Sequence, residues 1–171
     1  MRRQIFPAFV FLSLAFFCCQ EKNKSSARIA TAVIDSASIL TDVQEEDLLS
    51  IINSLEKDVG SQIVIMTVNS LSGQSIEQFS ITAAEKLKIG RKKENDGILI
   101  TVATQEHKTR IEVGTGLEKI IGDEVAARII REEMAPEFKN GKFYEGLRAA
   151  TTRIKTMIEE NRQLVGTPPY P

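Results

Sequence analysis

The sequence predicts an α/β fold, a single-domain α/β/α sandwich with a mixed sheet of about four strands. Strand and helix patterns alternate in the order β-α-β-α-β-β-α-α, without internal repeats or low-complexity inserts. The last two strands are close enough in the chain to pair as a hairpin, which makes the sheet mixed. The composition, 42% hydrophobic and 26% charged residues, is that of one ordinary soluble domain with an additional segment.

The first strand and helix of this order lie ahead of Gly60. The stretch TAVIDSAS predicts a short extended segment that ends at Asp35. Thr41 and Gln44 have the spacing of a capping box, which begins a helix, and Gly60 stops that helix. The apolar residues between these points recur at helical spacing: Leu48, Leu49, Ile52 and Leu55.

The second strand and helix follow directly. The segment Gln62–Val68 is β-branched and apolar on both parities, which predicts a strand buried on both faces. Ser75 can cap a helix that Gly90 closes. One face of this helix is apolar: Ile76, Phe79, Ala83, Ala84 and Leu87.

A hairpin and a helical C-terminal part complete the domain. GILITVA and TRIEVG are predicted strands, and the short segment TQEHK joins them. Helical patterns then cover DEVAARIIREEMAPEFKNG and FYEGLRAATTRIKTMIEENRQLVG. Pro136 lies inside the first of these and predicts a kink or a break.

The N-terminal segment, residues 1–19, predicts a signal peptide of the lipoprotein type. Arg2 and Arg3 precede the apolar run Ile5–Phe17, whose roughly 13 residues are fewer than the ~20 that span a bilayer as a helix. A polar tether is expected over residues 20–30, the folded domain over 31–165 and a tail over 166–171. We therefore expect an exported protein, anchored to a membrane of the cell envelope or periplasmic.

Cys18 and Cys19 stand where a bacterial lipidation cysteine would stand. Cys19 is the better candidate, because the small Cys18 precedes it, whereas Phe17 precedes Cys18. The alternative is that both are ordinary residues of a signal peptide or an uncleaved anchor. No other cysteine occurs, so the domain is expected to have no internal disulfide.

Charge and residue usage exclude several functional classes. The chain has 22 basic and 23 acidic residues and a net charge of -1, so it offers no large basic field and no nucleic-acid partner is expected. His107 is the single histidine and falls at the predicted hairpin tip, which argues against a histidine-based triad. Serines such as Ser61 and Ser72 have no evident base, so no catalytic residue is assigned.

The predicted hairpin brings distant loops together. If its strands are antiparallel, the segment Asn95–Gly97 meets the segment Gly114–Gly116. Gly97, Gly114 and Gly116 are then expected to shape the backbone of this corner, and positive φ at Gly114 or Gly116 would make that shape specific.

Acidic residues gather around the same corner in the sequence. Asp96 precedes Gly97, and Asp123 and Glu124 lie at a predicted helix start, with Glu112 and Glu118 as further candidates. Carboxylates together with loop carbonyls are the ligands that calcium requires, so the pattern predicts a Ca²⁺ site. The alternatives are turn formation at Asp96-Gly97 and an N-cap at Asp123.

Several blocks of the sequence together resemble the TPM domain family, which includes plant thylakoid-lumen and bacterial envelope proteins. The blocks are VIDSASIL, DVGSQIVIMTV, KIGRKKENDGILITVA, RIEVGTGLEKIIGD and RIIREEMAPEFKNGKFYEGLRAA, and they extend from about Ile34 to Ile158. The resemblance implies an α/β/α sandwich with a cation site, reported to bind calcium in some members. An acid phosphatase activity is attributed to plant members.

Carried over by position, the resemblance adds Asp35 to the acidic candidates, so that the predicted metal ligands are Asp35, Asp96, Asp123 and Glu124. Thr115 departs from the family, which often has an aromatic residue between the two glycines. We therefore expect an exported, lipid-anchored protein that binds Ca²⁺ and acts as an interaction module for an envelope protein. The alternatives are a metal-assisted acid phosphatase and a structural domain whose carboxylates are caps.

Overall fold

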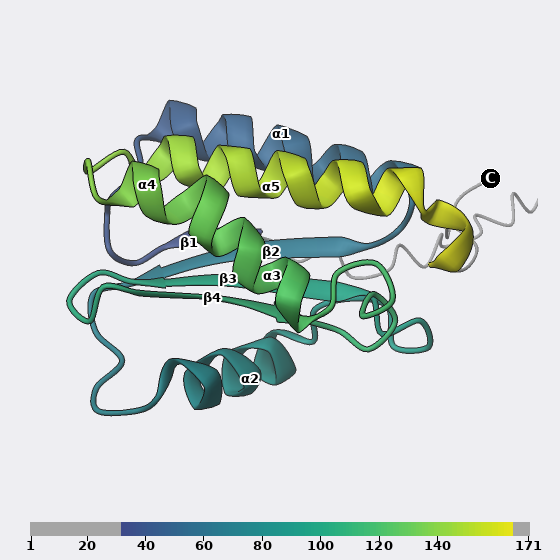
Figure 1. The fold of residues 1–171 in the computed structure, drawn as a ribbon, viewed down its shortest axis with the longest axis horizontal. Helices are drawn as coiled ribbons and strands as arrows, with labels where there is room; N and C mark the ends of the chain where they lie inside the picture. The colour runs from purple at the N-terminus through teal and green to yellow at the C-terminus, as the bar shows by residue number, and fades with distance from the viewer. Residues whose placement is uncertain (1–31, 166–171) are drawn as a thin grey trace, which may run out of the picture.

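In the computed structural model of the chain, residues 32–165 are described (Figure 1). The predicted signal peptide with Cys18 and Cys19, the tether and the tail lie outside these residues. The elements are β1 (Val33–Asp35), α1 (Asp42–Asp58), β2 (Gln62–Val68), α2 (Ile76–Leu87), β3 (Gly97–Ala103), β4 (Lys108–Val113), α3 (Asp123–Ile129), the π-helix η1 (Ile130–Met134), α4 (Ala135–Phe138), α5 (Phe143–Glu160) and the 3₁₀-helix η2 (Arg162–Leu164).

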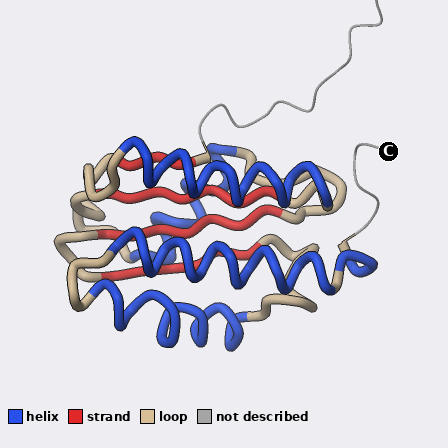
Figure 2. Tube along the Cα trace, turned by 90° about the horizontal axis from the view of Figure 1, so that it is seen from above, coloured by secondary structure: helices blue, strands red, loops and turns tan. Residues whose placement is uncertain are grey.

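The strands form one four-stranded sheet in the order β1-β2-β3-β4. The pairs β1–β2 and β2–β3 are parallel, and β3–β4 is the antiparallel hairpin that the sequence predicts. Figure 2 shows the strands side by side beneath the helices of one face. The predicted α/β fold with a mixed four-stranded sheet is therefore confirmed.

The two faces of the sheet are covered unequally. Helices α1 and α5, together with the α3–α4 segment, lie over one face, and α2 lies over the other (Figure 1). The larger cluster of buried side chains fills the first face, and much of it is aliphatic: Ile63, Ile65, Ile98 and Ile100 of the sheet pack with Leu48, Ile52, Leu147 and Ile154 of the helices. Under α2 the buried apolar cluster is small, and the hydroxyls of Ser80 and Thr101 bond there at 2.9 Å.

The two crossovers between parallel strands have opposite hands. Both step in the same direction across the sheet, from β1 to β2 and from β2 to β3. Their helices, α1 and α2, cover opposite faces (Figure 1). One of the two is therefore left-handed, although about 98% of such connections are right-handed.

The helix boundaries follow the predicted signals closely. The Thr41 hydroxyl accepts from the backbone of Gln44 and the Gln44 side chain accepts from the backbone of Thr41, so the predicted capping box is present. Ser75 caps α2 as predicted, and Lys88, with a φ of 53°, ends that helix two residues before Gly90. Within residues 32–165, no helix is both long and apolar enough to cross a bilayer.

The helix around Pro136 is interrupted, as predicted, and the interruption takes the form of a wider π-helical turn. Its ring removes one backbone donor and clashes with the carbonyl four residues earlier, so a regular α-helix cannot run through it. The chain instead forms the π-helical turn η1 immediately before α4, whose first turn contains Pro136. This turn separates α3 from α4 while keeping the segment on one face of the sheet.

The corner predicted from the hairpin is present and is closed by backbone hydrogen bonds. The N–H of Gly114 donates to the carbonyl of Gly97 at 2.8 Å, and the N–H of Gly116 donates to the carbonyl of Asn95 at 3.0 Å. The Asn95 amide also donates to the Thr115 hydroxyl at 2.7 Å. The Glu94–Gly97 loop and the glycine loop are therefore one packed unit.

The glycines of this corner are needed for space. Neither Gly114 nor Gly116 is among the residues with positive φ, so the expectation of a specific φ is wrong. A Cβ atom at Gly114 would instead overlap the carbonyl oxygen of Asn95, and one at Gly116 would overlap that of Glu94. The group that approaches the glycine loop so closely is the protein backbone itself.

We expect Gly116→Ala to destabilise the domain by about 1–3 kcal/mol, the usual cost of forcing extra bulk into a packed site. The measurement is urea unfolding of purified protein. Gly122→Ala is the matched control: its Cβ would lie 3.3 Å from the carbonyl oxygen of Glu118, a tight contact without overlap, and its loss should reflect mainly the poorer N-cap of α3. Equal losses for the two variants would show that the close packing of the corner contributes little.

Candidate functional site

Asp96 is a fully buried carboxylate held by an arginine. Its Oδ1 accepts from the backbone N–H of Arg91 at 2.7 Å, and its Oδ2 accepts from Arg91 Nε at 2.8 Å. Arg91 Nη2 lies 2.7 Å from the same Oδ2, and the Ser61 hydroxyl donates to it at 3.2 Å. Both oxygens are thus engaged, and Asp96 joins the loop before β3 to the start of β2.

Asp35 organises a different loop. It ends β1, and its Oδ2 accepts from the N–H of Leu40 at 2.9 Å. The Thr67 hydroxyl donates to its Oδ1 and accepts from the N–H of Ala37 at 3.1 Å. Asp35 therefore fixes the connection from β1 to α1 against the end of β2.

The sheet separates these two aspartates. Asp35 is level with Thr67, and Thr67 is level with Val102, near the carboxyl end of β3. Asp96 precedes the first residue of the same strand, six positions earlier, which is roughly 20 Å at about 3.3 Å per residue. The sequence predicts that Asp35 and Asp96 belong to one site. In the structure they lie at opposite ends of the strands and do not form one.

Asp123 and Glu124 lie at the start of α3 and are exposed. The N-cap of α3 is Gly122, so Asp123 is the first helical residue and not the cap. Within residues 32–165, no three His, Cys, Asp or Glu side chains are grouped so that they could hold a metal ion. The predicted four-carboxylate set is not assembled there, and calcium binding stays a prediction.

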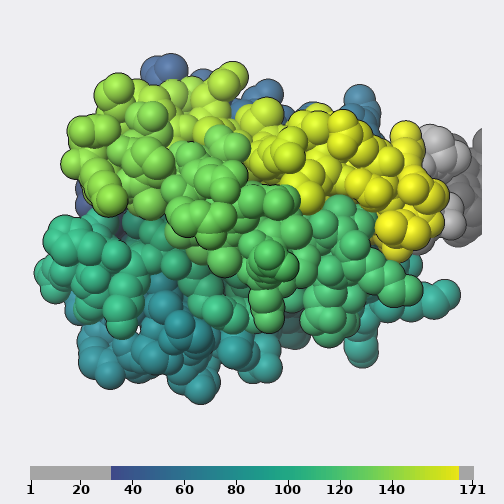
Figure 3. Space-filling view, viewed as in Figure 1, coloured from purple at the N-terminus to yellow at the C-terminus, as the bar shows by residue number. Residues whose placement is uncertain are grey.

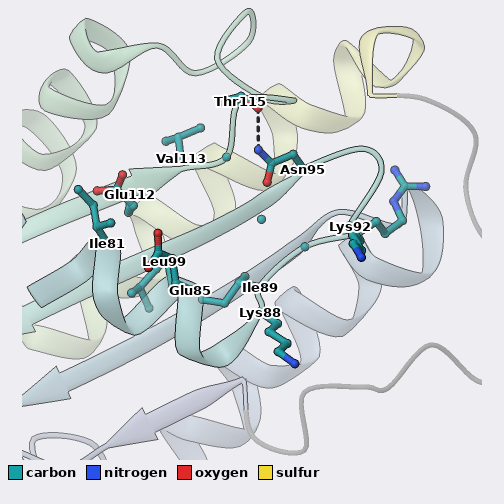
Figure 4. A pocket seen from close by; sticks show the side chains of 15 residues that line it. Ile81, Glu85, Lys88, Ile89, Lys92, Asn95, Leu99, Glu112, Val113 and Thr115 are labelled. Carbon is teal, nitrogen blue, oxygen red and sulfur yellow. Dashed lines mark hydrogen bonds between the residues drawn. The ribbon is translucent and has the colours of Figure 1, made fainter. Parts of the chain in front are cut away.

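A cleft of about 520 Å³ lies beside the corner, between α2 and the β3–β4 pair (Figure 4). The side chains at its base and walls are mainly apolar: Ile81, Ala84, Ile89, Leu99 and Val113. Gly90, Gly97 and Gly114 bring bare backbone to its surface. The volume lies within the ~300–1,000 Å³ range of ligand pockets.

The rim of the cleft carries charges of both signs. Figure 4 shows Glu112 near Ile81 and Lys92 on the opposite side, with Glu85 and Lys88 next to each other at the end of α2. Glu112 is partly neutralised, because its Oε2 accepts from Arg110 Nε at 2.7 Å.

Sequence reasoning missed this cleft, although one signal was available. Ile81 lies off the apolar face predicted for α2 and is 39% exposed. Single exposed apolar residues are normal, so Ile81 becomes informative only with Leu99 and Val113, which the fold brings to the same cleft.

The hairpin tip has no catalytic partner arrangement around its histidine. His107 is exposed with a φ of 50°, in the turn where the sequence places it. The neighbouring Glu106 accepts from the N–H of Leu71 at 2.9 Å and from the Ser70 hydroxyl at 2.8 Å. These two hydrogen bonds, the first foremost, lower the pKa of Glu106 and keep it charged. Its role is to hold the loop after β2.

Solved structures of similar fold are bacterial proteins. The N-terminal domain of a protein from P. gingivalis shares 25% identity at a TM-score of 0.74, over 82% of this chain and 89% of that one. The BA42 protein of Bizionia argentinensis shares 21% at 0.62, over 71% and 82%. The N-terminal domain of the cg2496 protein of Corynebacterium glutamicum shares 12% at 0.61, over 78% and 83%.

The sequence comparisons identify a protein family, but they match no individual curated protein at a significant level. The family model of the TPM domain matches residues 33–157, which include the whole sheet, the corner and most of α5. The resemblance found in the sequence is thereby confirmed, and the chain belongs to the TPM domain family.

Proposed function

We propose that this TPM-domain protein is an exported, lipid-anchored interaction module of the cell envelope, and that the cleft beside the corner receives a segment of its partner. The observation that carries the proposal is the apolar surface of that cleft, which is bordered by charges of both signs. Buried interface centres in proteins have this composition, with apolar contacts inside and polar groups at the rim.

The sign pattern of the rim favours a polypeptide ligand. Glu112 lies on one side and Lys92 on the other (Figure 4). A peptide segment with one apolar side chain between a basic and an acidic residue would match all three parts of this surface. Such complementarity selects the partner more than it strengthens binding.

The packing of the corner supports a preformed site. Gly97 and Gly114 line the cleft, and the N–H of Gly114 is bonded to the carbonyl of Gly97. A rigid surface loses little conformational entropy when a partner binds.

We expect a photo-crosslinking amino acid in place of Ile81 to capture a discrete envelope protein in cells that produce the full chain. The matched control is the same replacement of Val43, an apolar residue of α1 that is 76% exposed on the other face of the sheet. The readout is the adduct pattern on a gel, with the captured protein identified by mass spectrometry.

Identical adducts from both positions, or none from position 81, would contradict the proposal. A second outcome bears on the alternative function. Steady turnover of a generic phosphomonoester by the purified protein, abolished by Asp123→Ala, would favour a metal-assisted acid phosphatase over an interaction module.

We also propose that Ca²⁺ binds at the α3 end of the corner. Asp96 and Asp35 are committed to Arg91 and to the β1–α1 loop, so Asp123 and Glu124 are the exposed members of the predicted ligand set. Two carboxylates supply part of the six to eight oxygens that calcium takes, so water and backbone carbonyls would supply the rest.

At ~100 times its dissociation constant, Ca²⁺ should stabilise the folded protein by about 2.7 kcal/mol and raise its Tm. Asp123→Asn with Glu124→Gln should remove this increase, whereas Glu132→Gln, an exposed change in η1, should retain it. A melting temperature unchanged at millimolar Ca²⁺ would sink the idea.

The anchoring proposal rests on the N-terminal sequence. Multiple acyl chains on Cys19, at about 0.8 kcal/mol per buried methylene, would hold the protein at a membrane surface. Cys19→Ser should release the protein from the membrane fraction or leave an unprocessed precursor, and Cys18→Ser should change little. Mass spectrometry of the mature N-terminus checks this, and an N-terminus beyond Cys19 without acyl mass would refute it.

A further inference from the structure

A second pocket lies far from the corner, where the end of the β3–β4 hairpin meets the η1–α4 segment. Its volume is about 300 Å³, and it is on the face of the sheet opposite α2. Figure 3 shows the hairpin end and the α4 region next to each other at one end of the molecule. We call it the hairpin pocket.

The walls of the hairpin pocket are apolar. Val102 and Ala103 of β3 are buried at 2% and 1% exposure, and across from them lie helical residues. The apolar side chains on the helical side are Ile130, Ala135, Phe138 and Phe143. A pocket of this kind favours the apolar body of a ligand.

The aromatic wall is held in place by its own packing. The rings of Phe138 and Phe143 have centroids 5.1 Å apart at an interplanar angle of 47°. Gly146 lies so close behind Phe138 that a Cβ there would be 2.7 Å from the ring. The π-helical turn before Pro136 sets the position of this segment over the hairpin.

The rim of the hairpin pocket is cationic. Lys108 and Lys139 line it and are exposed, and His107 stands beside them. The two nearby carboxylates each have a neighbour that holds one oxygen, and Glu106 Oε2 is buried without a hydrogen-bond partner among the described residues. Glu106 accepts from Ser70 and the N–H of Leu71, and Glu137 lies 3.9 Å from Lys142.

We propose that the hairpin pocket binds a small carboxylic acid with an apolar body, of the size of a medium-chain fatty acid. The apolar walls take the hydrocarbon, and Lys108 and Lys139 face the carboxylate at the mouth. Glu106 at the same hairpin tip repels any anion, and it repels a doubly charged ligand such as a phosphate monoester about twice as strongly as a carboxylate. This site is independent of the cleft beside the corner and of any partner bound there.

The size of the pocket sets the probe. At ~30 Å³ per water-sized group, it holds about ten such groups, and octanoate has about ten non-hydrogen atoms. A ligand so small, with exposed ion pairs, should have a dissociation constant on the order of 1 mM.

The test is a titration of the mature protein with octanoate, followed by backbone amide NMR. We expect saturable shifts at residues of the pocket such as Ala103, His107 and Phe143, and much weaker ones with octylammonium, which has the same body and the opposite charge. Lys108→Gln with Lys139→Gln should weaken octanoate binding roughly two- to thirty-fold, the effect of removing two exposed charge contacts.

The matched control is Lys88→Gln with Lys92→Gln, which removes two cations from the other cleft and should leave octanoate affinity unchanged. All four lysines are exposed, so both double variants should fold. Equal binding of octanoate and octylammonium, shifts centred on the corner, or no saturation by about 10 mM, ten times the expected constant, would overturn the proposal.

Discussion

The buried pair of Asp96 and Arg91 is the interaction on which the corner depends. A carboxylate with no exposed surface is stable only if its charge is matched and its lone pairs are filled, and Arg91 and Ser61 do both. Breaking such a pair by removing one partner costs about 3–5 kcal/mol. Arg91 also donates to the carbonyl of Val165 at 3.2 Å, so the pair ties the C-terminal end of the described chain to the loop before β3.

The same pair decides what the acidic corner can do. A carboxylate that neutralises a largely covered guanidinium is not a free metal ligand, because releasing it would leave the arginine charge uncompensated. The loop that it fixes then carries Glu94 and Asn95 against the two glycines, and this contact forms one wall of the cleft. Asp96 therefore fixes the loop that forms one wall of the cleft.

Features that depend on residues close together in the chain could be predicted from the sequence. The relative positions of side chains from distant segments could not. The capping box at Thr41, the cap at Ser75 and the hairpin each depend on residues a few positions apart, and all are present. Asp96 enters the predicted site through the hairpin geometry, and Asp35 joins it only through the family resemblance. Their separation depends on the register of β1 and β3 through β2, which no local pattern encodes. The partner of Asp96 was missed for a related reason: Arg91 looks like part of a solvated basic run, and its burial emerges only from packing against the loop.

The unequal covering of the sheet explains where open surface remains. On the α1 and α5 face, helices cover the strands and the buried cluster is large, and the hairpin pocket lies at the end of this face, beside the π-helical turn. On the other face, α2 alone must cover strands whose outward residues include Leu99 and Glu112, and at its C-terminal end the cleft opens. Because the two crossovers have opposite hands, α1 lies on one face of the sheet and α2 on the other. Each face therefore carries one crossover helix. The topology thus leaves α2 without a neighbouring helix, and an open cleft remains beside it at the corner that the Asp96–Arg91 pair holds in place.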